Sequence, residues 1–97
     1  MKNSEMTRKE IWDKVIQNLK TLDQEAHDEE FVPLLTSLLV ILAEELRTNV
    51  VNGTITQEDK SHMWGLVDEI GCFSIKGETI KYLPGYKDLI ALLRKVF

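Results

Sequence analysis

Few side chains in this sequence could act as a nucleophile, a base or a metal ligand: one cysteine, Cys72, and two histidines, His27 and His62. The histidines stand 35 residues apart, and neither has a cysteine or a paired carboxylate at the spacing of a zinc site. His62 and Cys72 could meet as base and thiol, with Asp68 orienting the imidazole. Because a free cysteine usually behaves as a small buried hydrophobe, we expect a solvated His62 and a core Cys72 instead.

The carboxylates are numerous, but their spacing does not build a site. Glu44 and Glu45 are adjacent, so on a helix their side chains point about 100° apart. Glu58 and Asp59 fall in the first turn of a predicted helix, where the helix dipole accounts for them. Residues 49–59 lack the alternating oxygen ligands of an EF-hand, and no glycine-rich phosphate loop is present. The sequence therefore predicts no catalytic residue, no metal site and no cofactor, hence a protein that is not an enzyme.

Four stretches have the apolar spacing of a helix, and these helices must position any functional side chain. The predicted helices cover residues 7–27, 30–51, 56–71 and 86–97. Thr7 and Glu10 have the form of a capping box at the first start, and Thr56 repeats the start signal before the third helix. Gly53 is expected to end the second helix, as glycine commonly does.

Between the third and fourth helices, two β-prone segments flank a turn. Residues 72–75 and 79–82 roughly alternate about Lys76-Gly77, which predicts a β-hairpin, with a loop as the alternative. The predicted fold is mainly all-α: a four-helix bundle with the hydrophobic second helix at its centre and this small hairpin. We expect one domain over residues 1–97, with residues 1–6 frayed.

The most apolar stretch lies in the second helix. Residues 31–43 contain ten apolar side chains and no charge, so a helix formed by them is hydrophobic on every side and has to be covered all round. The run is shorter than the roughly 18 residues of a membrane span. Because the third and fourth helices are short, we expect a second copy of the chain or another protein to complete the cover, most simply in a homodimer.

The charge pattern favours a protein partner over nucleic acid. Twelve basic and sixteen acidic residues give a net charge of −4, and much of the acidity gathers on helix faces that could meet a basic protein. The two tryptophans are candidate anchors, although burial in the core is their commoner use. The candidate partner-binding residues are Trp12, Glu29, Glu30, Glu44, Glu45 and Trp64.

A nucleic-acid regulator is the alternative, because three helices followed by a hairpin is the element order of a winged helix. Its phosphate contacts would be the basic residues of the last 26 positions, and they would have to share one face. These residues are Lys76, Lys81, Lys87, Arg94 and Lys95. The helix that would read the bases carries four acidic residues against the single Lys60, which argues against this role.

Together these features predict a non-catalytic protein–protein interaction module: a small acidic homodimer acting as an inhibitor, adaptor or immunity-type protein. In size, acidity and helical content the chain is similar to small bacterial immunity and inhibitor proteins as a class. The lone cysteine and the amphipathic rather than signal-like N-terminus favour a cytoplasmic location. A small-molecule or lipid site in the second-helix core would need an internal cavity, which a sequence cannot show.

Overall fold

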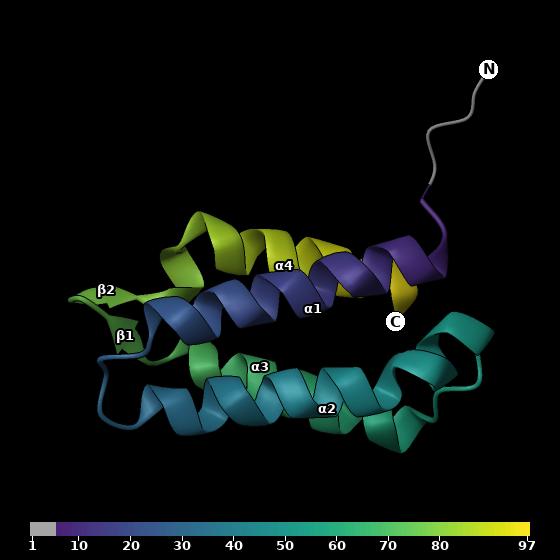
Figure 1. Ribbon diagram of the computed structural model, residues 1–97, viewed down its shortest axis with the longest axis horizontal. Helices are drawn as coiled ribbons and strands as arrows, with labels where there is room; N and C mark the ends of the chain where they lie inside the picture. Colours follow the sequence, from purple (N-terminus) through teal and green to yellow (C-terminus); the bar gives the residue numbers. More distant parts are fainter. Residues whose placement is uncertain (1–5) are drawn as a thin grey trace.

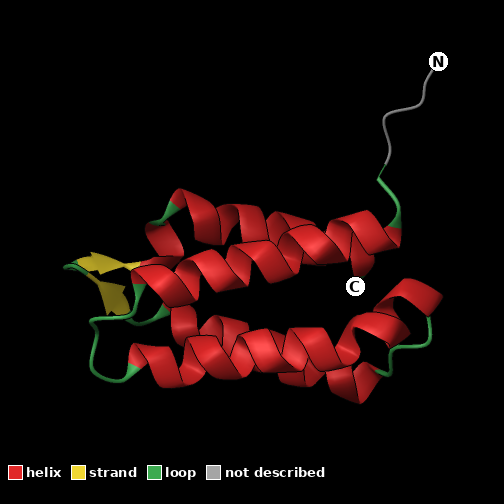
Figure 2. Cartoon of the chain, viewed as in Figure 1, coloured by secondary structure: helices red, strands yellow, loops and turns green. Residues whose placement is uncertain are grey.

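The computed structural model describes residues 6–97 and confirms a mainly α-helical fold of four helices with a two-stranded hairpin between the third and the fourth. Residues 1–5 lie outside the described part, so the expected fraying of residues 1–6 is untested there. The elements are α1 (Arg8–Glu25), α2 (Val32–Asn52), α3 (Gln57–Gly71), β1 (Ser74–Ile75), β2 (Glu78–Thr79), the 3-10 turn η1 (Ile80–Tyr82) and α4 (Pro84–Val96). Figure 2 shows how helix dominates the chain.

Helices α1 and α2 form the main interface of the bundle, α4 packs on α1, and α3 packs on α2 (Figure 1). The bundle thus has two inner helices, whereas the apolar pattern of the sequence predicts only the second at the centre. The reason is the width of the α1 apolar stripe, which serves both neighbours. Its buried residues are Ile11, Trp12, Val15, Ile16, Leu19 and Leu22.

The helix ends follow the local signals in the sequence. The Thr7 hydroxyl accepts from the Glu10 amide at 3.1 Å, and the Glu10 carboxylate accepts from the Thr7 amide at 3.0 Å, so the predicted capping box is present. The second of these bonds lowers the pKa of the Glu10 carboxyl. Thr56 caps α3 through the Asp59 amide at 3.1 Å. Gly53, at φ 72°, ends α2 in the left-handed conformation that favours glycine.

The hairpin is shorter than the sequence predicted, with strands of only two residues each. Lys76 and Gly77 both have positive φ, 51° and 85°, as a tight type I′ turn requires. Residues 80–82 form a 3-10 turn rather than the end of a strand, closed by the Leu83 amide donating to the Ile80 carbonyl at 2.9 Å. The side chain of Ile80 is fully buried, so tertiary packing outweighs the β propensity of this segment.

Candidate interaction surface

Four large apolar side chains of the α2 segment face solvent in a line. They are Phe31 at the N-cap and then Leu34, Leu38 and Ile41, with 62%, 71%, 44% and 54% of their surface exposed. We call this set the α2 stripe. Its spacing of three, four and three residues keeps all four on one side of the helix. An exposed apolar row of this kind is typical of an unpaired helix–helix seam.

The stripe exists because α2 has only one face against the rest of the bundle. On the far side of the helix the buried residues are Val32, Thr36, Leu39, Ala43, Leu46 and Val50. A helix over residues 31–43 needs cover on all sides, and within residues 6–97 that cover is incomplete. The Cα atoms extend over 43 × 31 × 17 Å, so the bundle is flattened, and a flat arrangement leaves the outer side of a helix open.

Polar contacts with α1 fix the rotation of α2, and hence the direction in which the stripe points. The Asp23 carboxylate accepts from the hydroxyl of Thr36, which is fully buried, and from that of Ser37 at 3.1 Å. Two neighbouring hydroxyl groups of α2 therefore donate to the same carboxylate on α1. The Thr36 hydroxyl also lies 3.3 Å from the Pro33 carbonyl in its own helix, so the Asp23 carboxylate orients α2 through the pair of hydroxyls rather than as the only acceptor for Thr36.

Two ion pairs continue the same α1–α2 junction along the helices. Arg47 donates to both oxygens of Asp13, with Nε–Oδ1 at 2.8 Å and Nη2–Oδ2 at 3.3 Å. This guanidinium contact lowers the pKa of the Asp13 carboxyl and raises that of Arg47. Lys20 lies 3.5 Å from Glu44. Both pairs are exposed, so they act mainly on register and orientation rather than on stability.

Acidic residues stand at both ends of the α2 stripe. Asp28 and Glu30 precede it and are exposed, and Glu45 follows it and is exposed as well. Glu29 is half-buried, and its carboxylate accepts from the Lys76 amide at 3.1 Å, which ties the α1–α2 turn to the hairpin. Of the four predicted partner-binding glutamates, Glu30 and Glu45 are therefore free of such internal bonds among residues 6–97, while Glu29 and Glu44 take part in them.

The two predicted tryptophan anchors occupy different environments. Trp12 is fully buried and its indole donates to the Ala43 carbonyl at 2.8 Å, so it is a core residue and is not available to a partner. Trp64 is half-buried and meets Phe97 edge to face with ring centroids 6.1 Å apart, while Trp12 lies 5.5 Å from the same ring. Phe97 thus joins the two tryptophans in one aromatic cluster.

The five basic residues of the nucleic-acid alternative come from three different elements. Lys76 is in the hairpin turn, Lys81 is in η1, and the other three lie on α4. All five are exposed, and the Lys81 ammonium lies 5.3 Å from the centre of the Tyr82 ring. With strands of two residues each, the hairpin offers only a short wing.

The cysteine and the histidine considered as a catalytic pair do not come together. Cys72 is exposed at the C-cap of α3, with Sγ 3.6 Å from the Asp68 carbonyl, so the expected core position is wrong. At about 100° per residue, Cys72 falls on the side of α3 opposite the buried Met63, Val67 and Ile70, which accounts for its exposure. His62 lies on α3 ten residues earlier, about 15 Å along the helix, which is beyond hydrogen-bond reach.

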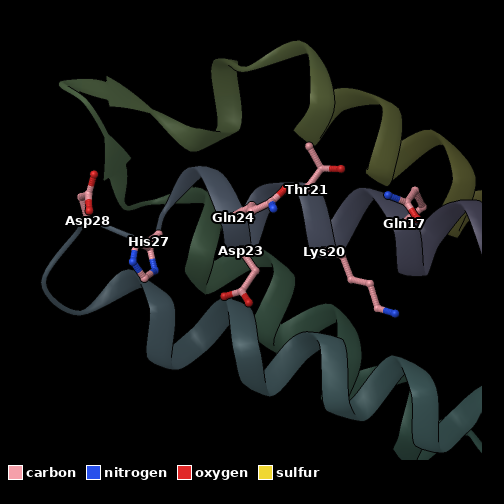
Figure 3. Close-up of a pocket in the computed structure, with 7 residues that line it drawn as sticks. All are labelled: Gln17, Lys20, Thr21, Asp23, Gln24, His27 and Asp28. Atoms are coloured by element: carbon pink, nitrogen blue, oxygen red, sulfur yellow. The ribbon is translucent and has the colours of Figure 1, made fainter.

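A shallow polar hollow runs along α1 and the turn that follows it (Figure 3). Its lining residues are Gln17, Lys20, Thr21, Asp23, Gln24, His27 and Asp28. Figure 3 shows Lys20 and Asp23 pointing toward α2, where both already have partners. These side chains do not converge on a common point, so the hollow has neither the depth nor the convergent polar groups of a ligand site.

Within residues 6–97, no helix has both the length and the apolarity that crossing a bilayer requires. In comparisons of the chain with protein families, with curated proteins and with solved structures, no match is found. Any functional conclusion therefore depends on the chemistry of the surface itself, and the α2 stripe with its acidic ends is the most distinctive part of it.

Proposed function

We propose that the protein is a non-catalytic protein–protein interaction module, of the inhibitor or adaptor type, and that the α2 stripe is its contact surface. The observation that carries this proposal is the exposure of Phe31, Leu34, Leu38 and Ile41 in one row. Contiguous exposed apolar patches of this kind on water-facing surfaces are where proteins bind other proteins.

The anatomy of the surface supports this role. A typical interface has an apolar centre and a polar, solvent-accessible rim. Here the stripe is the centre, and the exposed acidic residues Asp28, Glu30 and Glu45 lie at its two ends. The homodimer predicted from the sequence and a complex with a different protein would both use this surface.

The test is affinity capture from a lysate of the source organism. The baits are the wild-type chain, the double variant Leu34→Asp/Leu38→Asp and the control double variant Glu58→Gln/Glu69→Gln on α3. Because Leu34 and Leu38 are exposed, their replacement should leave the helical circular dichroism unchanged. We expect at least one protein to be retained by the wild type and the control but lost with the stripe variant. If every retained protein binds all three baits equally, the stripe is not the contact surface.

A further inference from the structure

The seam geometry of the α2 stripe restricts what can cover it. Residues spaced three and four apart on one helix face are paired, in known helix assemblies, by a second helix that inserts its own apolar side chains between them. From Phe31 to Ile41 the stripe covers eleven residues, and the ten steps between its ends span about 15 Å at 1.5 Å per residue. The complementary element is therefore a helix of about three turns with an apolar face.

The exposed area of the α2 stripe is smaller than the area that a stable interface buries on each partner. The four exposed fractions add up to a little more than two large side chains, or about 450 Å² at roughly 200 Å² each. A stable interface buries about 800 Å² on each partner. Flanking residues must supply the remainder, and those available are the half-buried Leu35 and Leu42 and the charged residues at the two ends.

The charges at those ends decide between the possible occupants. Asp28 and Glu30 stand before the stripe, and Glu44 and Glu45 stand after it. Two copies packed stripe on stripe in parallel would bring each acidic end against itself. Packed antiparallel, they would bring the first acidic end against the second. Either orientation places like charges together. Glu29 adds a fifth carboxylate, and the lysines beside these ends are Lys20, which pairs with Glu44, and Lys76, whose amide binds Glu29, so acidic side chains outnumber the cations five to two.

A partner with positive charge at both ends of its apolar face has no such conflict. We infer that the α2 stripe binds a basic amphipathic α-helix of another protein, whose apolar side chains pack on Leu34 and Leu38 and whose lysine or arginine side chains meet Glu30 and Glu45. This inference rests on the proposed function and names the chemistry of the partner. The charges speed association and select the partner, while the stripe supplies the contact area.

The probes for the test are two synthetic helical peptides of three to four turns. Both carry leucines at the spacing of the stripe; one has lysine at every flanking position and the other has glutamate. Isothermal calorimetry at low and high salt measures their binding to the full chain. We expect the lysine peptide to bind at least tenfold more tightly than the glutamate peptide, with an affinity that falls as salt rises.

Three variants of the chain separate the contribution of the apolar stripe to peptide binding from that of the acidic ends. Leu34→Asp/Leu38→Asp should weaken binding of the lysine peptide at least tenfold. Glu30→Gln/Glu45→Gln should weaken it several-fold and flatten its salt dependence. The matched control Glu58→Gln/Glu69→Gln, which removes the same charge from exposed positions on α3, should leave both unchanged.

Other outcomes would overturn the inference. Equal binding to the stripe variant would show attraction by charge alone, and equal binding of the two peptides would show that the acidic ends select nothing. A dimer of the chain in light scattering, lost in the stripe variant, would identify a second copy as the occupant. If neither peptide binds while capture from lysate still depends on Leu34 and Leu38, the basic helix is wrong and the interaction module stands.

Discussion

Helix α2 offers a matched pair of leucines, five residues apart, that the structure places in opposite environments. Leu39 is fully buried, whereas Leu34 is 71% exposed. We predict that Leu39→Ala lowers the free energy of unfolding by about 3 kcal/mol, since removal of a buried leucine loses its transfer free energy and leaves a cavity. Leu34→Ala removes the same atoms from water rather than from the core, so its cost should be at most about 0.5 kcal/mol.

Urea denaturation followed by tryptophan fluorescence measures both values, because the fully buried Trp12 reports loss of the core. For a chain of this size, a loss of 3 kcal/mol lowers the melting temperature by roughly 12–24 °C, which thermal unfolding would show independently. Leu38→Ala, at 44% exposure, should fall between the other two.

Equal losses of unfolding free energy in Leu34→Ala and Leu39→Ala would refute the assignment of Leu34 to an exposed surface. A cost for Leu34→Ala close to that for Leu39→Ala would mean that the isolated chain already covers the stripe. The surface on which the proposed function depends would then not exist in the free protein.

Two further predictions concern glycines of α3 and the Tyr86 side chain, which reaches from α4 to the Val67 carbonyl of α3. Gly71→Ala should destabilise the protein by roughly 1–3 kcal/mol, because an added Cβ would lie 2.6 Å from the Tyr86 hydroxyl. Gly65→Ala, with open space around the added Cβ, should stabilise the protein by up to about 1 kcal/mol. Denaturant titration of the two variants measures both changes in the free energy of unfolding. Burial, with smaller effects of the Asp68 and Cys72 charges, raises the pKa of Tyr86. The contribution of Tyr86 to the free energy of unfolding should therefore be fully present below about pH 10, the pKa of tyrosine in the unfolded chain. It should be lost as the pH rises through the higher pKa that Tyr86 has in the folded protein. The alkaline loss should shrink in Tyr86→Phe; an unchanged alkaline loss in that variant would contradict the assignment.

Local signals made most of the fold predictable from the sequence. The capping box at Thr7 and Glu10, the cap at Thr56 and the glycine stop at Gly53 each act through bonds or dihedral angles within a few residues, so sequence spacing is enough to locate them. The tight turn at Lys76-Gly77 has the same origin, since it depends on φ at two adjacent residues.

The candidate surface was only partly predictable, for a physical reason. Residues 31–43 are apolar on every side, so periodicity shows that some cover is missing but not which face lacks it. That choice is made by long-range contacts such as Asp23 with Thr36 and the Trp12 indole with the Ala43 carbonyl. The exposure of Cys72 and the 3-10 turn at residues 80–82 likewise depend on tertiary packing.

Site-specific photo-crosslinking in living cells would show whether the α2 stripe touches another protein. A photoreactive amino acid replaces Leu38 on the stripe in one strain and Ser61, exposed on α3, in another. We expect a discrete higher-mass adduct from position 38 and not from position 61. The same adducts from both positions, or none from position 38, would contradict the claim that the α2 stripe is where this protein meets its partner.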